Sequence, residues 1–286
     1  MLALAAVAWT GVAWATWPDV ERLARERPDT TAFMRRYLER RVEQPDLPAL
    51  RWAWAPLAET SVHAQRAVVS AEDMEFFHHR GFSSSEIRAA IEDALRGDDL
   101  RGASTITQQL AKNLWLTPTR NPLRKVREAI LTRQLERQLS KSRILEIYLN
   151  VVELGPGIYG VETAARQYFG GSAAALTARQ AAMLAASLPR PSSWHPGVES
   201  RAYASYVDDI LGRMGRAEFL WSYVRGSVPI DLEPSPVDSG LLATPTTPGA
   251  EVVVPSPVSD SGLVVPPPPP DTGRSVSPPD EGDDGS

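Results

Sequence analysis

Carboxylates and histidines crowd one short stretch of the chain. Residues 70–82 read SAEDMEFFHHRGF and place Glu72, Asp73 and Glu75 among three aromatic side chains and two histidines. A carboxylate flanked by like charges and apolar rings can have its pKa raised, which makes it a usable base near neutral pH. The same composition also fits a solvated helix end, so the residue types alone leave both interpretations open.

Small hydroxyls, side-chain amides and cations follow in a second stretch. Residues 102–113 read GASTITQQLAKN, in which Ser104 and Thr105 suit the N-cap of a helix that continues to Asn113. The N–H groups at a helix N-terminus bind anions, and this stretch favours a phosphate or pyrophosphate site. A solvated, charged helix face is the alternative. The cations that precede the next acid, Glu128, include Lys112, Arg120, Arg124 and Lys125.

The sequence GPGIYG at residues 155–160 matches the G-x-G-x-x-G pattern of dinucleotide folds. Such a fold needs a preceding strand and an acidic residue about 20 positions later. Here the pattern predicts a preceding helix, and Gln180 stands at the later position. We therefore interpret the motif as a glycine-rich turn between helices. A metal site also finds little support, because the four histidines form no H-E-x-x-H motif and the chain has no cysteine.

The residues around these motifs show helical periodicity and predict a mainly α fold. Asn121 and Pro122 favour the start of a long helix whose apolar positions recur mostly at three- and four-residue steps. Capping boxes are indicated at Ser83–Glu86 and at Thr177–Gln180, and the second opens a helix that stops at Pro189. No alternating strand and no internal repeat is evident. The apolar positions of the long helix are Leu123, Val126, Ile130, Leu131, Leu135 and Leu139.

The first residues of the chain are apolar enough to suggest a membrane anchor. Residues 1–17 read MLALAAVAWTGVAWATW, at the short limit of a membrane-spanning helix, with tryptophans near one end. A cleaved signal peptide and a buried core helix are the alternatives. Three arginines between residues 22 and 27 would favour the opposite orientation, so we expect a basic leader upstream of Met1. We assign residues 1–18 to an uncleaved transmembrane anchor.

Residues 229–286 differ in composition from the rest of the chain. They hold fourteen prolines, no aromatic residue, ten acidic residues and one basic residue. Such a segment cannot bury enough apolar surface to offset its ordering entropy, so we predict a disordered, Pro-rich acidic tail. Its net charge of −9, taken from the whole-chain −5, leaves +4 on the remaining residues. A mildly basic body suits a polyanionic partner such as nucleic acid, anionic lipid or a phosphorylated substrate.

Five motifs, in this order, resemble those of the monofunctional peptidoglycan glycosyltransferases, which are related to the glycosyltransferase domain of bifunctional penicillin-binding proteins. The departures are small: Gln180 stands where that family usually has Glu, and no transpeptidase domain follows. The motifs lie at Glu72–Gly81, Gly102–Asn113, Arg124–Asn150, Gly155–Gly170 and Leu176–Pro189.

The resemblance implies a lysozyme-like α-helical glycosyltransferase domain over residues 19–228, with a small lobe that dips into the membrane beside the anchor. It implies a single-pass protein of the bacterial inner membrane with its catalytic domain on the periplasmic side. The substrates would be lipid II and the growing glycan chain, joined into β-1,4-linked strands with inversion and release of undecaprenyl diphosphate. Other cell-wall synthesis proteins could be partners, and no nucleic-acid partner is expected.

The same resemblance implies roles for individual residues. Glu72 corresponds to the catalytic base and Glu128 to a second essential carboxylate. The four cations would stabilise the departing pyrophosphate, and the hydroxyl and amide side chains would hold sugars and phosphates. No cofactor is required, although a Mg or Mn ion could assist. The residues expected to bind substrate are Ser104, Gln108, Gln109, Lys112, Arg120, Arg124 and Lys125.

Two other functions remain open from the sequence. A lysozyme-like hydrolase or lytic transglycosylase would cleave glycan strands with a similar fold and one essential glutamate. Cleaving a neutral sugar linkage requires neither the basic cluster nor the anchor, which disfavours this reading. A non-catalytic membrane scaffold could recruit enzymes through the proline-rich tail, but the complete motifs argue against lost catalysis.

Overall fold

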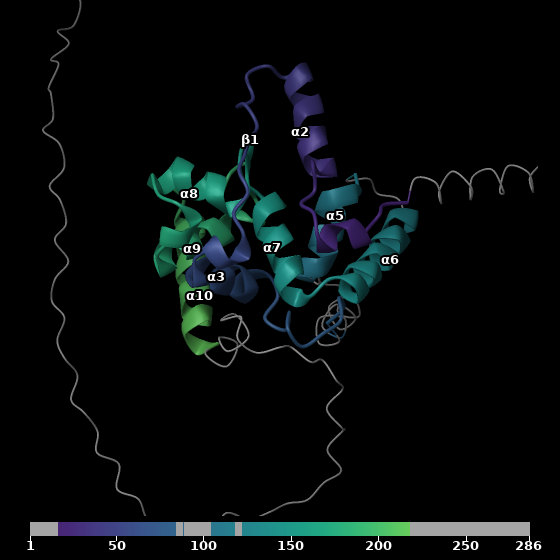
Figure 1. Ribbon diagram of the computed structural model, residues 1–286. Helices are drawn as coiled ribbons and strands as arrows, with labels where there is room; N and C mark the ends of the chain where they lie inside the picture. The colour runs from purple at the N-terminus through teal and green to yellow at the C-terminus, as the bar shows by residue number, and fades with distance from the viewer. Residues whose placement is uncertain (1–16, 84–87, 89–103, 118–121, 218–286) are drawn as a thin grey trace, which may run out of the picture. The chain divides into compact units, whose positions relative to one another are not determined.

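The chain is predominantly helical in the computed structural model (Figure 1). The mainly α prediction is confirmed for the residues that the structure describes, and none of their helices has the length and apolar character needed to cross a membrane. The described residues are 17–83, 88, 104–117 and 122–217. Outside them lie most of the expected anchor, residues 84–86 of the expected capping box at Ser83–Glu86, Arg120, Asn121 and the expected tail.

The described part begins with the 3-10 turn η1 (Glu21–Ala24) and helix α2 (Ala32–Glu43). Thr31 is the N-cap of α2, and its side-chain oxygen accepts a 3.0 Å hydrogen bond from the N–H of Met34. Met34 and Tyr37 are buried, and α2 packs against α5 (Ile106–Trp115). The N-terminal segment is thereby joined to the helix that carries the second motif.

The remaining helices form two packed groups. Helix α3 (Val62–Glu72) packs against α9 (Ala178–Ser187) and α10 (Arg201–Arg216). Helix α5 packs against α6 (Pro122–Gln138) and α7 (Lys141–Val151). Figure 1 shows α7 between α3, α9 and α10 on one side and α5 and α6 on the other, and most residues of this helix are buried. Its polar residues can therefore reach the ends of both α3 and α5.

Three short strands form a small sheet beside the helices: β1 (Arg51–Trp52), β2 (Glu153–Gly155) and β3 (Ile158–Tyr159). Their order is β1-β3-β2, with β1 parallel and β2 antiparallel to β3. No alternating strand is evident in the sequence, and the structure adds these three short segments. Strands of two or three residues are too short to show an alternating pattern.

The hairpin of β2 and β3 contains the GPGIYG motif and leads from α7 into α8 (Val161–Phe169). Gly160 has a φ of +79°, and a Cβ at this position would lie 2.6 Å from the carbonyl oxygen of Asn150. Only glycine combines this backbone conformation with so close an approach. The motif is a turn between helices, as expected, with two strand segments added.

Helix α6 carries two apolar faces. Successive residues turn by about 100°, so residues 123, 126 and 130 lie on the side opposite to residues 131, 135 and 139. In the sequence all six residues fit one periodic pattern, whereas the structure divides them between two faces. Leu131, Leu135 and Leu139 are 0%, 0% and 7% exposed and belong to the core. Leu123, Val126 and Ile130 are 61%, 57% and 46% exposed, and we call these three residues the α6 stripe.

Two helix starts follow the expected capping chemistry. Thr105 caps α5 and forms a capping box with Gln108. Thr177 and Gln180 do the same for α9, which ends at Ser187 shortly before Pro189. Each box satisfies backbone N–H groups that a helix leaves without partners at its N-terminus. The N-terminal turn of α5 is thus fixed beside Asp73 and Gly81.

Candidate active site

Glu72 is the last residue of α3 and is only partly exposed. Burial raises the pKa of its carboxyl group, while the hydrogen bond from Gln109 and the charge of Lys112 oppose that rise. The side-chain amide of Gln109 donates from Nε2 to Glu72 Oε2 at 2.7 Å. This environment gives Glu72 the property expected of a general base, a proton affinity above that of an ordinary carboxylate.

Tyr148 of α7 fixes the orientation of that amide. Its hydroxyl donates to Gln109 Oε1 at 2.7 Å, so the Gln109 amide must present its NH₂ group to Glu72. Tyr148 is completely buried, and this burial raises the pKa of its hydroxyl well above the usual value. The hydroxyl therefore stays protonated and remains a donor. A hydrogen-bonded chain runs from Tyr148 through Gln109 to Glu72.

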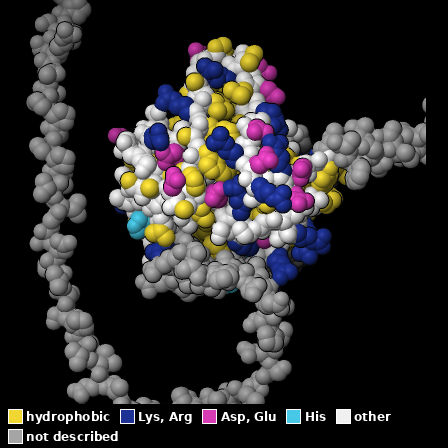
Figure 2. Space-filling view, in the orientation of Figure 1, with side chains coloured by type: hydrophobic (Ala, Val, Ile, Leu, Met, Phe, Trp, Pro, Cys, Tyr) yellow, Lys and Arg dark blue, Asp and Glu magenta, His cyan; other side chains and the backbone are white. Residues whose placement is uncertain are grey.

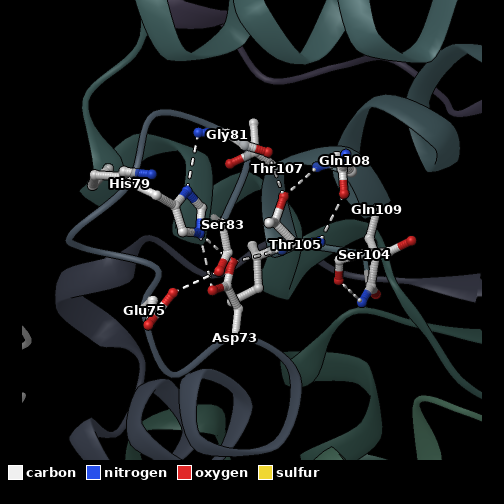
Figure 3. A network of polar contacts seen from close by, with 12 residues as sticks. Asp73, Glu75, His79, Gly81, Ser83, Ser104, Thr105, Thr107, Gln108 and Gln109 are labelled. Atoms are coloured by element: carbon white, nitrogen blue, oxygen red, sulfur yellow. Dashed lines mark hydrogen bonds and ion pairs between the residues drawn. The ribbon is translucent and has the colours of Figure 1, made fainter. Parts of the chain in front are cut away.

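Asp73, next to Glu72, is engaged in a separate network (Figure 3). Both of its carboxylate oxygens lie 3.0 Å from Nε2 of His79, and Oδ2 also accepts from the N–H of Ile106 at 3.0 Å. The N–H of Gly81 donates to His79 Nδ1 at 3.0 Å, which places the ring proton on Nε2, facing Asp73. Asp73 is buried and its oxygens are occupied, so it holds the segment in place and leaves Glu72 to contact a substrate.

The same network ties the loop after α3 to the start of α5. Thr105 Oγ1 donates to the carbonyl oxygen of Gly81 at 2.8 Å (Figure 3). Gly81 has a φ of +91°, and a Cβ there would lie 2.7 Å from the Cγ2 atom of Thr132 in α6. The first and second motifs, separate in the sequence, therefore share one rigid support for Glu72 and Gln109.

Glu128 of α6 lies inside a cationic group. Its carboxylate is 2% exposed overall and contacts Lys125 Nζ at 2.5 Å and Arg124 Nη1 at 3.2 Å. The three residues are three and four positions apart on one helix, so they share a face. A buried carboxylate with two cations holds them in a defined geometry, and the three side chains together carry one net positive charge.

Lys112 of α5 links this group to the base. Burial lowers the pKa of its ammonium, the carboxylate of Glu128 opposes that change, and the charges of Lys125 and Arg124 reinforce it. Glu72 also acts on Lys112 electrostatically. Glu72 therefore shares one site with three of the predicted cations, Lys112, Arg124 and Lys125. Lys and Arg side chains, interleaved with acids, gather over the part of the face in Figure 2 where Figure 1 places α5 and α6.

The structure brings together most of the residues that the sequence singled out, with different contacts for two of them. Gln109 faces Glu72, and Gln108 uses its side-chain carbonyl to accept from Thr105 N in the capping box. The carbonyl oxygen of Ser104 lies 3.3 Å from Gln109 Nε2. Arg120 lies outside the described residues. Tyr148 was missed, because a tyrosine at an apolar helical position is read as core.

The residues at this site offer little to a metal ion. Each oxygen of Glu128 already contacts a cation, and both oxygens of Asp73 contact His79. Across the described ranges, no three His, Asp or Glu side chains are grouped closely enough to hold a metal ion. Among the described residues of this site, the carboxylates therefore form no cage for Mg or Mn.

A partly buried carboxylate with a raised pKa can take a proton from a hydroxyl group, and nearby cations can stabilise an anionic leaving group. The helical fold and this site are of the kind found in enzymes that transfer a group by acid–base catalysis. Residues 43–215 match the family model described as Transglycosylase.

Two curated relatives agree with that match. A biosynthetic peptidoglycan transglycosylase of Azoarcus sp. (strain BH72) is 44% identical over 208 residues, which cover 72% of this chain and 90% of the relative. A protein with the same description from Nitrosospira multiformis is 44% identical over 191 residues, or 66% of this chain and 83% of the relative. The chain belongs to the transglycosylase family.

Proposed function

We propose that this enzyme polymerises lipid II into β-1,4-linked glycan strands and releases undecaprenyl diphosphate. Family membership makes the chain a peptidoglycan glycosyltransferase of cell-wall synthesis, associated with the cell envelope. The observation that carries the proposal is the pairing of Glu72, held by Gln109, with Lys112 and the cations around Glu128. Glu72 accepts a proton from the attacking hydroxyl group, and the cations stabilise the negative charge of the departing diphosphate. Transfer of a sugar from a diphosphate requires both.

Glu72 removes the proton from the 4-hydroxyl group of the incoming lipid II. The freed oxygen attacks C1 of the last sugar of the growing chain, from the face opposite to the diphosphate. The new C–O bond forms while the bond from C1 to the diphosphate oxygen breaks, so the α-linked donor becomes a β-linked product. A positioned base of this kind contributes about 10²–10⁴-fold to the rate.

The cations complete the step on the leaving-group side. The electron pair of the broken bond passes to the diphosphate, where negative charge increases. Lys112, Arg124 and Lys125 stabilise that charge, and Arg120 is assigned to the same task on the family resemblance. Glu128 acts as a positioning residue, because its carboxylate holds Arg124 and Lys125 together. Preorganised charges cost little reorganisation when the reaction occurs.

We assign residues 1–18 to a single-pass anchor in the inner membrane, 19–228 to a lysozyme-like catalytic domain on the periplasmic side, and 229–286 to the disordered tail. The apolar sequence of residues 1–17 supports the anchor. The position of Trp17 also supports it, because its indole donates to Gln134 Oε1 at 2.8 Å beside the exposed α6 stripe. That stripe is our candidate for the membrane-dipping surface of the small lobe.

The decisive experiment incubates the detergent-purified chain with labelled lipid II and separates the products on a gel. The wild type should produce long glycan strands, and Glu72→Gln should abolish them. Glu39→Gln, an exposed carboxylate of α2, serves as the control and should retain activity. Persistent polymer in Glu72→Gln would move the base elsewhere. Shortening of preformed strands without polymerisation would instead identify a hydrolase.

A further inference from the structure

A cavity of about 430 Å³ lies between the N-terminal segment and helices α5 and α6. None of its lining residues belongs to the candidate active site. Its volume falls in the range of small-ligand sites, roughly 300–1,000 Å³. Four arginines contribute to its wall, from three different parts of the fold: Arg22, Arg27, Arg35 and Arg127.

The arginines give this cavity an excess of positive charge. Asp19 and Asp29 are the acids in the wall, and Arg22 already pairs with Asp29 and with Glu26 outside it. In the part of the chain that the structure describes, the guanidinium groups of Arg27 and Arg35 make no hydrogen bond or ion pair, and both side chains are exposed. The Nε atom of Arg127 is buried and lacks a hydrogen-bond partner there. A buried donor without a partner is costly, and a phosphate group would satisfy it.

The surroundings of Arg127 connect the cavity to the apolar face of α6. Its guanidinium lies over the ring of Trp17, 5.3 Å from the ring centroid, and the Trp17 indole donates to Gln134. At about 100° per residue, Arg127 and Gln134 share a side of α6 with Leu123 and Ile130. The cavity therefore opens beside exposed apolar side chains and beside the end of the apolar N-terminal run.

We propose that this cavity binds the phosphate group of an anionic phospholipid, whose acyl chains lie over the α6 stripe. The guanidinium groups bind the phosphate, and Leu123, Val126 and Ile130 contact the hydrocarbon. A soluble phosphate would use the arginines but not the apolar residues beside them, so the lipid accounts for both features. The inference rests on the proposed attachment to the membrane.

The test measures lipid retention on the full chain by native mass spectrometry in detergent, with phosphatidylglycerol or phosphatidylcholine added. The wild type should retain one phosphatidylglycerol molecule in preference to phosphatidylcholine. Arg127→Gln should weaken that retention roughly tenfold, because a charge-assisted hydrogen bond is lost. Arg27→Gln with Arg35→Gln should weaken it too, and both side chains are exposed, so this variant keeps its fold.

The control is Arg179→Gln, an exposed arginine of α9 that pairs with Asp208 away from the cavity lining. It should retain the lipid as the wild type does. Equal retention in all variants, equal retention of both lipids, or displacement by sn-glycerol 3-phosphate would overturn the proposal. Polymerisation of lipid II is assayed on the same samples. Its absence in the wild type would refute the proposed function, whereas lipid retention tests the cavity alone.

Discussion

Glu72 holds a carboxyl group where its charged form is poorly solvated, and this has a consequence for stability. Its pKa is raised on folding, so the folded chain binds more protons than the unfolded chain at pH values between the ordinary and the raised pKa. The free energy of unfolding therefore falls as pH rises through that window, and does not change through this group below it. The base is maintained at the expense of stability near neutral pH.

Replacing Glu72 by Gln should therefore stabilise the protein while abolishing activity. The gain in the free energy of unfolding should be present at about pH 7.5 and vanish at about pH 3, where the wild-type carboxyl is protonated in both states. Thermal unfolding midpoints at the two pH values measure it. Glu39→Gln, on the exposed face of α2, is the control and should give no gain at either pH. A stabilisation that is independent of pH would exclude burial of charge as its cause.

Tyr148 offers a second prediction at the scale of one residue. Tyr148→Phe removes the hydroxyl that holds Gln109 Oε1, which frees the amide to turn its oxygen toward Glu72. The acid limb of the pH–rate profile should then move to higher pH, and the lost buried hydrogen bond should cost about 1–3 kcal/mol of stability.

The matched control for Tyr148→Phe is Tyr203→Phe, which removes another buried tyrosine hydroxyl. Tyr203 donates to the carbonyl oxygen of Met183 at 2.8 Å, away from Glu72. It should lower stability and leave the acid limb in place. If both variants moved the limb equally, Tyr148 would have no specific role in orienting Gln109.

At the scale of elements, the hairpin that joins α7 to α8 depends on one close approach. Gly160→Ala should destabilise the chain strongly, because the added Cβ would meet the backbone of Asn150 at 2.6 Å. Gly170→Ala is the matched control, since its φ is +70° but nothing lies within 4 Å of the added atom. The control should cost only about 1–2 kcal/mol of left-handed backbone strain. Thermal unfolding compares the two, and equal losses would attribute both to strain alone.

Helix caps could be predicted from the sequence, whereas the buried face of a helix could not. A capping box is local, so the one at Thr177 was placed correctly from spacing alone, and Thr105 was one of two N-cap candidates for α5. The two faces of α6 could not be separated, because apolar residues on opposite sides of one helix still recur at three and four positions. Ile130 and Leu131 are neighbours in sequence, yet one is 46% exposed and the other 0%. Only the packing of α5 and α7 against α6 decides which face is core.

At the candidate active site, contacts within one helix could be predicted from the sequence, but contacts between helices could not. The pairing of Glu128 with Arg124 and Lys125 follows from their spacing on one helix, and resemblance pointed to each of the three. The chain from Tyr148 through Gln109 to Glu72 joins three helices, and no spacing within one element reports it. Motifs identified which residues matter, whereas the fold determined which of them touch.

At the scale of the whole molecule, charge and hydrophobicity are unevenly distributed along the chain. The acidic tail, the mildly basic body and the apolar N-terminal run suit a protein that works at a membrane. We predict that the full chain stays in the membrane fraction through washes with high salt and alkaline carbonate, and is released by detergent. Fractionation followed by immunoblotting measures this. Release by salt alone would contradict the anchor and indicate electrostatic attachment to the membrane.

Helix α6 also constrains how this protein can change during evolution. Two neighbouring residues of α6 contact different sites. Arg127 lines the cavity beside Trp17, and Glu128 contacts the cations of the candidate active site. A single inserted or deleted residue would rotate one half of the helix by about 100° relative to the other. The cations would leave the active site and apolar residues would leave the core together. Among natural variants, we therefore expect length changes to accumulate in loops and to be absent from this helix.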